Sequence, residues 1–286
     1  MQELYKQYRS LLFALAYQMT GSVSDAEDVV QDVFLKAYAV GGLDHIDNPK
    51  AYLCKMASNR CRDVFRSARK KREQYFGPWL PEPLLSSDES IEESIIQHEL
   101  LSYGILVLLE RLSSSERTVF VLREALGFSY ADIASMIEMS EANCRKLFSR
   151  SKAKMGISPG EYTSIEGASE AWIARFLKAL QQNQAVELTA MLAEDVILIS
   201  DGGGKAVAAV HPIESRERVI RFLAGLIRNM SAGEGRTELV MERINGQTGL
   251  VVVSDNIVET VVLLNMQEDC IQNIYFVRNP DKLTRI

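Results

Sequence analysis

Residues 128–154 decide how the middle of the chain folds, and they read Phe128-Ser-Tyr-Ala-Asp-Ile-Ala-Ser-Met-Ile-Glu-Met-Ser-Glu-Ala-Asn-Cys-Arg-Lys-Leu-Phe-Ser-Arg-Ser-Lys-Ala-Lys154. Ser129 stands where it can cap a short helix. Glu138 and Met139 form a tight connection, and Ser140 can cap a second helix. Two short capped helices joined in this way are typical of a helix-turn-helix.

The second of these helices has an outer face suited to DNA. Cys144 and Ser151 are predicted to face inward with Leu147 or Phe148. The outer face carries amide, hydroxyl and cationic groups that can read base edges in a major groove or bind phosphate. Its residues are Asn143, Arg145, Lys146, Ser149 and Arg150. A purely structural helical hairpin is the alternative, but it would not need this selection of polar residues.

A further basic block lies upstream, in residues 44–72, which hold nine basic and three acidic residues. Pro49 fits the first turn of a helix, and residues 50–72 are predicted to continue that helix. Polar and cationic residues recur at helical spacing along one side, opposite the apolar stripe. They are Lys55, Asn59, Arg62, Arg66 and Arg69. Nucleic-acid phosphate is the partner that best explains such a row of cations.

Residues 25–38 are predicted to form an amphipathic helix with Ser24 as its N-cap. Asp25, Asp28 and Asp32 fall together, away from the centre of its apolar stripe. One interpretation is a solvated acidic face that offsets the helix dipole. The other is a docking surface for a basic partner.

The whole-chain composition limits the classes of protein. With 286 residues, 47% hydrophobic and 24% charged, the chain is globular and long enough for more than one domain. No run of eighteen apolar residues is present, and the apolar run in residues 11–17 is predicted to be a core helix, not a signal peptide. Four cysteines and three histidines lack ligand-like spacing, so neither a disulfide framework nor a metal site is indicated, and the cytoplasm is the expected compartment.

The net charge of -6 conceals this pattern of blocks. Residues 73–110 carry eight carboxylates and no Lys or Arg, so an acidic linker separates the two basic blocks. Because salt screens charges over about 8 Å, a polyanion responds to the local patch and not to the total.

Together these stretches resemble the extracytoplasmic-function sigma factors, group 4 of the sigma-70 family. Residues 25–34 resemble the helix that binds the β′ clamp of RNA polymerase, residues 48–66 the promoter -10 helix, and residues 112–154 the -35 domain. The resemblance implies core RNA polymerase, through its β′ clamp and β flap, and promoter DNA as partners. It also implies that polymerase supplies the catalysis, so that this chain needs no catalytic residue, metal or cofactor.

The same resemblance assigns roles to individual residues. Polymerase binding falls to Asp25, Asp28 and Asp32. Binding of the -10 strand falls to Lys55, Asn59, Arg62 and Arg66, and residues 40–47 form the loop that receives an extruded base. Binding of the -35 element falls to Asn143, Arg145, Lys146, Ser149 and Arg150.

About 130 further residues follow the second basic block and predict another domain. Helices are expected at 168–182 and 214–229, and strands at 237–244, 248–253, 257–266 and 270–278. Asn245-Gly246, Asp255-Asn256 and Glu268-Asp269 are the expected turns between the strands. Helices followed by an antiparallel meander suggest an α+β cone, which resembles the SnoaL-like fold.

Three short motifs resemble those of a sigma-factor subgroup with a fused SnoaL-like domain that regulates itself in cis. They are Trp79-Leu-Pro-Glu-Pro83, Asp201-Gly-Gly-Gly-Lys205 and Asn279-Pro-Asp-Lys-Leu283. The predicted regulatory contacts are Trp79, Asp201, Lys205 and Asp281. Taken singly, the motifs could be a stiff proline linker, a glycine turn and a terminal turn.

An enzymatic alternative follows from the same fold, since SnoaL-like cones also occur as isomerases and cyclases. The chain would then be a DNA-binding protein fused to an enzyme that converts a small molecule. His211 would act with Asp201 or Asp195 as an acid-base pair.

The sequence therefore predicts a multidomain protein with two all-α domains, the second a helix-turn-helix, and a C-terminal α+β SnoaL-like cone. The expected boundaries are 1–75 for sigma region 2, 76–108 for the acidic linker, 109–158 for sigma region 4 and 165–286 for the regulatory domain. A small-molecule ligand in the C-terminal pocket is a further expected partner.

Overall fold

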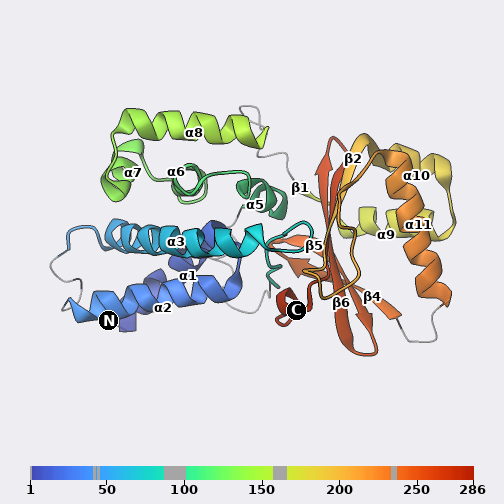
Figure 1. The fold of residues 1–286 in the computed structure, drawn as a ribbon, viewed down its shortest axis with the longest axis horizontal. Coiled ribbons are helices and arrows are strands. Elements are labelled where there is room, and N and C mark those ends of the chain that lie inside the picture. The colour runs from blue at the N-terminus through green and yellow to red at the C-terminus, as the bar shows by residue number, and fades with distance from the viewer. Residues whose placement is uncertain (1, 41–42, 44–45, 87–100, 157–165, 233–236) are drawn as a thin grey trace. The chain divides into compact units, whose positions relative to one another are not determined.

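The computed structural model describes residues 2–40, 43, 46–86, 101–156, 166–232 and 237–286, which divide into two compact units (Figure 1). The first unit holds the described residues up to Glu73, together with Leu101 and residues 105–156. The second holds Gln74–Ser86, Ser102–Gly104 and the described residues from 166 to 286. Among the described helices, none is both long and apolar enough to cross a membrane.

In the described part of the first unit, every regular element is a helix (Figure 1). Its elements are α1 (Gln2–Thr20), α2 (Val23–Ala39), α3 (Pro49–Glu73), most of α5 (Tyr103–Leu109), α6 (Ser114–Glu124), α7 (Tyr130–Ile137) and α8 (Glu141–Met155). The predicted first core helix is confirmed, since Leu12, Leu15 and Met19 of α1 are fully buried. The predicted caps at Ser129 and Ser140 are confirmed as well, because each hydroxyl accepts a hydrogen bond from the backbone three residues later.

The predicted cap of α2 at Ser24 was wrong. The cap is Ser22, whose backbone is extended and whose hydroxyl accepts a hydrogen bond from the amide of Asp25. Gly21, with a φ of 69°, adopts the left-handed conformation that ends α1. The chain therefore leaves α1 already extended at Ser22, and α2 starts as soon as a side chain can cap it.

A buried arginine connects the helices of the first unit. Arg117 of α6 is fully buried and donates hydrogen bonds to the carbonyls of Met19 (2.8 Å) and Leu109 (3.0 Å) and to the Glu110 carboxylate. Its guanidinium also lies 5.3 Å from the ring centroid of Phe65 in α3. One side chain thus ties α6 to the end of α1 and to α3.

The second unit is an α+β domain. Its helices are α9 (Glu170–Gln181), α10 (Ala185–Met191) and α11 (Arg216–Ala232), followed near the end of the chain by the 3-10 helix η2 (Pro280–Lys282). Its strands are β1 (Glu166–Gly167), β2 (Leu192–Asp201), β3 (Ile213–Glu214), β4 (Thr237–Ile244), β5 (Gln247–Ser254), β6 (Ile257–Gln267) and β7 (Cys270–Val277). The strand order is β3-β2-β7-β6-β5-β4, with β1 paired to β6.

The three predicted strand turns are confirmed. All six of their residues, from Asn245 (φ 52°) to Asp269 (φ 65°), have positive φ, which matches tight hairpins of the primed types. The antiparallel description was incomplete, because β2 pairs in parallel with β7. The chain passes from β2 through β3 and α11 before the meander begins, and a parallel pair requires such a crossover. Likewise, the predicted helix 214–229 starts only at Arg216, because Glu214 belongs to β3.

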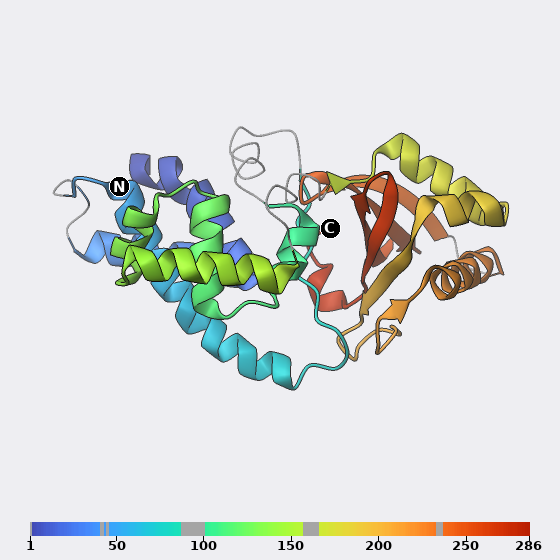
Figure 2. The same ribbon diagram turned by 90° about the horizontal axis from the view of Figure 1, so that it is seen from above.

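The core of this domain lies between the three helices and one face of the sheet, as Figures 1 and 2 show. Buried apolar side chains from α9, α10, α11, β2, β6 and β7 meet there; examples are Ile173, Phe176, Leu188, Val219, Leu198, Leu264 and Ile274. The α+β architecture that the sequence predicted for this domain is confirmed, with three helices against one face of a mixed sheet. Its opposite face and the end of β2 carry the site described below.

Candidate functional sites

The helix-turn-helix presents its predicted DNA-binding residues to solvent. Asn143, Arg145, Lys146, Ser149 and Arg150 of α8 are all exposed. Cys144 and Ser151 are buried, as predicted for the inward face. The outer face of α8 is therefore polar, cationic and accessible, as reading a major groove requires.

Neighbouring side chains hold Arg145 in place. Its guanidinium donates a hydrogen bond to Glu141 (2.9 Å) and lies 4.5 Å from the ring centroid of Tyr130 in α7. The helical spacing of Glu141 was visible in the sequence, whereas the stacking on Tyr130 depends on how α7 and α8 pack.

The cationic face of α3 is only partly open. Asn59 is exposed and Arg62 is half-buried, while the side chain of Arg66 lies outside the described residues. Lys55 donates a hydrogen bond to Glu138 (3.0 Å), the residue that ends α7. The hydrogen bond and the positive charge of Lys55 lower the pKa of the Glu138 carboxyl.

The predicted base-receiving loop, residues 40–47, is only partly described. Val40 and Asp47 are exposed and Leu43 is buried, whereas 41–42 and 44–45 lie outside the described residues.

The acidic residues of α2 differ in their surroundings. Asp28 is exposed, and Asp25 and Asp32 are half-buried. Asp32 accepts a hydrogen bond from Arg60 of α3 (2.7 Å), which neutralises one end of the acidic face. Sequence reasoning missed this pair because its members are 28 residues apart and on different helices.

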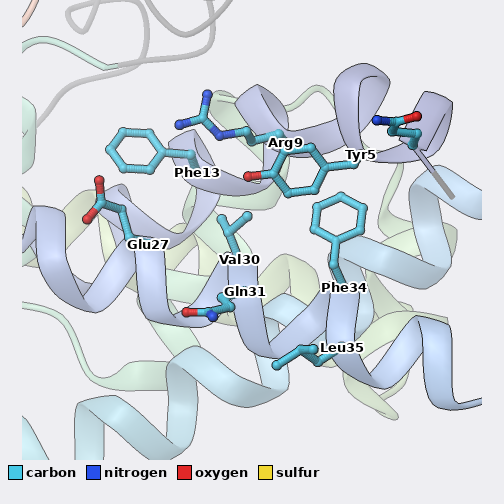
Figure 3. Close-up of a pocket in the computed structure, with 9 residues that line it drawn as sticks. Tyr5, Arg9, Phe13, Glu27, Val30, Gln31, Phe34 and Leu35 are labelled. Atoms are coloured by element: carbon cyan, nitrogen blue, oxygen red, sulfur yellow. The ribbon is translucent and has the colours of Figure 1, made fainter.

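An apolar groove of about 570 Å³ lies on another side of α2, between it and α1 (Figure 3). Tyr5 and Phe34 meet there with ring centroids 4.8 Å apart, and Arg9 and Glu27 contribute charge to its lining. No pattern in the sequence pointed to this groove.

In the second unit, residues 74–86, called the strap here, attach to the domain through Asp201. Asp201 ends β2 and is fully buried. Its carboxylate accepts hydrogen bonds from the Tyr75 hydroxyl (2.6 Å), the Leu80 amide (2.9 Å) and the Lys282 ammonium (2.7 Å). The burial of Tyr75 and its hydrogen bond to Asp201 raise the pKa of the Tyr75 hydroxyl. A carboxylate with three donors in a buried position is the centre of this site.

Lys282 of the terminal motif completes the arrangement. Besides binding Asp201, its ammonium donates to the Leu80 carbonyl (2.5 Å) and lies 4.0 Å from the centroid of a Trp79 ring. Trp79 thus supplies an aromatic face to a cation that is itself held by a buried carboxylate. The sequence motifs pointed to Trp79 and Asp201 but not to Tyr75 or to Lys282, although Lys282 belongs to the terminal motif 279–283.

The other two predicted contacts form a pair at the rim of this site. Lys205 and Asp281, both exposed, form an ion pair of 2.5 Å. The glycine motif and the terminal motif therefore meet each other.

The far end of the strap pairs with the tip of the β4–β5 hairpin. The Leu84 amide donates to the Asn245 side chain (3.0 Å), the Asn245 amide donates to the Leu84 carbonyl (2.8 Å), and the Ser86 amide donates to the Arg243 carbonyl (2.7 Å). Tyr103 adds a hydrogen bond to the Pro81 carbonyl (2.8 Å). The strap is thus an ordered part of the second unit along its length.

Among the described residues, no hydrogen bond or ion pair joins His211 to Asp201 or Asp195. His211 is exposed, Asp201 is occupied by the strap, and Asp195 accepts a hydrogen bond from Gln272 (3.0 Å). Within the described residues, no group of three or more His, Cys, Asp and Glu side chains could hold a metal ion.

Comparison with known proteins identifies the family. Residues 4–71 match the family model for sigma-70 region 2, and residues 104–155 match that for sigma-70 region 4. Over 98% of its length the chain is 28% identical to the ECF RNA polymerase sigma factor SigJ of Mycobacterium tuberculosis, across 92% of that protein. The chain is an extracytoplasmic-function sigma factor.

Other comparisons agree along the whole length of this sigma factor. It is 26% identical to the probable ECF RNA polymerase sigma factor SigI of Mycobacterium tuberculosis, over 98% of its own length and 93% of that protein. The crystal structure of SigJ covers 100% of this chain with a TM-score of 0.78 at 25% identity, and 99% of the SigJ chain is matched. Sigma factors direct transcription initiation with core RNA polymerase and are not enzymes, so the isomerase or cyclase alternative is set aside.

Proposed function

We propose that this sigma factor selects promoters through two separate surfaces and that its C-terminal domain controls them in cis through the strap. Asp25, Asp28 and Asp32 dock on the polymerase β′ clamp, and region 4 also contacts the β flap. The -10 strand is bound by Lys55, Asn59, Arg62 and Arg66. The -35 element is bound by Asn143, Arg145, Lys146, Ser149 and Arg150. The protein acts in the cytoplasm, and a small-molecule ligand of the C-terminal domain remains a prediction.

The exposure of α8 supports the -35 role. All five of its predicted contacts reach solvent on one helix, and the guanidinium of Arg145 is positioned before DNA arrives. Preorganised arginine loses less side-chain entropy on binding, which favours base recognition over general attraction.

The buried Asp201 carboxylate is the observation that carries the regulatory part of the proposal. It binds two strap residues and the terminal Lys282 at once, so the chain segment that follows region 2 is held by the C-terminal domain. A regulator must favour one arrangement over another by several kcal/mol to act as a near-complete switch. A fully buried carboxylate that accepts hydrogen bonds from three donors can contribute several kcal/mol.

Transcription with purified core polymerase and a genomic promoter library tests the proposal. The wild-type sigma factor should give discrete start sites. Trp79→Ala and Lys205→Met should change the amount of transcript without changing which promoters are used. Asp195→Asn is the matched control, because Asp195 lies in the same domain but contacts Gln272 and not the strap.

Two outcomes would contradict the proposal separately. No stable complex with core polymerase at low salt would refute promoter selection by this chain. Transcript levels for Trp79→Ala and Lys205→Met equal to those of Asp195→Asn would refute control through the strap.

A further inference from the structure

Within the first unit, an ion pair between Lys55 and Glu138 connects α3 to the turn between α7 and α8. Lys55 lies on α3, and Glu138 ends α7 in the left-handed conformation (φ 57°), in the turn that leads to α8. The two groups are 83 residues apart in sequence and 3.0 Å apart in space. Their side chains are 36% and 77% exposed, so solvent and other anions can reach the pair.

Other contacts show that this pair belongs to a closed arrangement. The Lys50 ammonium of α3 lies 5.3 Å from the ring centroid of Phe128, which precedes α7. The fully buried Arg117 ties α6 to α1 and α3 within the same unit. In the free protein, region 2 and region 4 therefore hold each other.

This closed unit cannot occupy both promoter elements at once. The centres of the -10 and -35 elements, as their position numbers state, lie about 25 base pairs apart, or ~85 Å at ~3.4 Å per step. A compact unit of about 140 residues measures only about 40 Å across. The first unit must open before α3 and α8 can reach their two elements together.

We propose that Glu138 is an internal competitor of promoter phosphate, which occupies Lys55 in the free sigma factor and latches the two DNA-binding halves together. The inference rests on the proposed role of Lys55 at the -10 strand. It is independent of the strap, because both partners lie in the first unit. DNA phosphate and the Glu138 carboxylate compete for one ammonium group, so binding of the -10 strand opens the latch.

The competition has a measurable signature in salt dependence. A lysine that neutralises a phosphate releases a counterion condensed on the DNA, and each such contact with a single strand contributes about 0.7 to the magnitude of the slope of log affinity against log salt. When phosphate displaces Glu138 from Lys55, the freed carboxylate takes up a cation from solution, which offsets the release from the DNA and suppresses the contribution of Lys55 to the slope. Removing the Glu138 charge restores that contribution.

The experiment uses the full-length protein and a fluorescein-labelled, mixed-sequence single-stranded DNA 20-mer, because phosphate contacts do not depend on sequence. Binding is measured by anisotropy between about 50 and 300 mM salt. Glu138→Gln should bind about two- to fivefold more tightly at low salt, as expected for loss of an exposed ion pair, and its slope should steepen by about 0.7. Asp132→Asn is the matched control: it removes an exposed charge from the same helix-turn-helix, where Asp132 bonds only its own cap Ser129 among the contacts described.

Variants of Lys55 distinguish its proposed role at the -10 strand from the proposed latch with Glu138. If Lys55→Gln binds the 20-mer as well as wild type, the proposed -10 role of Lys55 is wrong. If Lys55→Gln binds more weakly but Glu138→Gln behaves like Asp132→Asn, the -10 role stands and the latch is refuted. The latch is supported if Glu138→Gln steepens the slope in the wild-type background and has no effect in the Lys55→Gln background.

Discussion

Replacing Asp201 by Asn tests whether the buried carboxylate holds the strap. The two side chains have nearly the same size, so the change removes charge with little change in volume. One carboxylate oxygen of Asp201 accepts from Tyr75, and the other accepts from both the Leu80 amide and Lys282. An asparagine has one oxygen, and its NH2 group would face a donor at the other position.

The expected cost follows from the burial of the pair. Asp201 is fully buried and the Lys282 side chain is 10% exposed, so the variant leaves an ammonium without its carboxylate in a poorly solvated place. Breaking a buried pair in this way costs about 3 to 5 kcal/mol. The Leu80 carbonyl and the Trp79 ring still face Lys282, which places the expected loss at about 3 kcal/mol. For a unit of this size, that loss lowers the melting temperature by about 6 to 12 °C.

Tryptophan fluorescence isolates this transition, because both tryptophans of the chain, Trp79 and Trp172, lie in the second unit. In a Trp172→Phe background, Trp79 alone reports the strap. Asp201→Asn in that background should melt about 6 to 12 °C below its parent, and Asp195→Asn should melt with the parent. If Asp201→Asn melts within about 1 °C of the parent, Asp201 does not hold the strap.

Three further predictions follow from particular contacts. Gly203→Ala should loosen the strap as seen by Trp79 fluorescence, because Gly203 has a φ of 58° and a Cβ there would lie 2.8 Å from the Tyr75 hydroxyl and still nearer Asn279. Gly225→Ala in α11, where a Cβ meets nothing within 4 Å, should instead stabilise the protein by about 0.5 to 1 kcal/mol. A stabilising Gly203→Ala together with a destabilising Gly225→Ala would contradict this geometry. Burial opposes ionisation of Glu116, yet its hydrogen bonds from Lys154 and Ser113 lower the pKa of its carboxyl below 4.5. The stability that the ionised carboxylate provides is present above pH 4.5 and is lost as pH falls through the lowered pKa. Glu116→Gln should therefore flatten the acid side of a stability profile followed by circular dichroism, and an unchanged profile would count against this role. Arg117→Met should cost about 3 to 5 kcal/mol and raise amide exchange in α6, whereas exchange at wild-type rates would show that the buried arginine is dispensable.

Local chemistry alone determined much of the fold. Ser129 and Ser140 cap their helices, and Asn245-Gly246 turns the chain, because each depends on a residue's own backbone preferences and on neighbours within three or four positions. The division of α8 into a buried and an exposed face follows from helical periodicity in the same way. Such features can be predicted from the sequence because they do not depend on residues that are distant in the chain.

The start of α2 shows where local reading becomes ambiguous. Ser22 and Ser24 are both suitable caps, and they lie 3.1 Å apart through their hydroxyls. Gly21 decided between them by ending α1 early, so the correct signal was the residue that stops the preceding helix.

Tertiary structure alone decided which charges are available. Arg60 reaches Asp32 across 28 residues, Glu138 reaches Lys55 across 83, and Tyr75 reaches Asp201 across 126. A sequence shows that these groups are charged or polar, and even which motif contains them. It does not show which opposite charge comes within 3 Å, because that depends on how helices and strands pack after their ends have been fixed, and an ion pair or buried hydrogen bond has its strength only over that short distance.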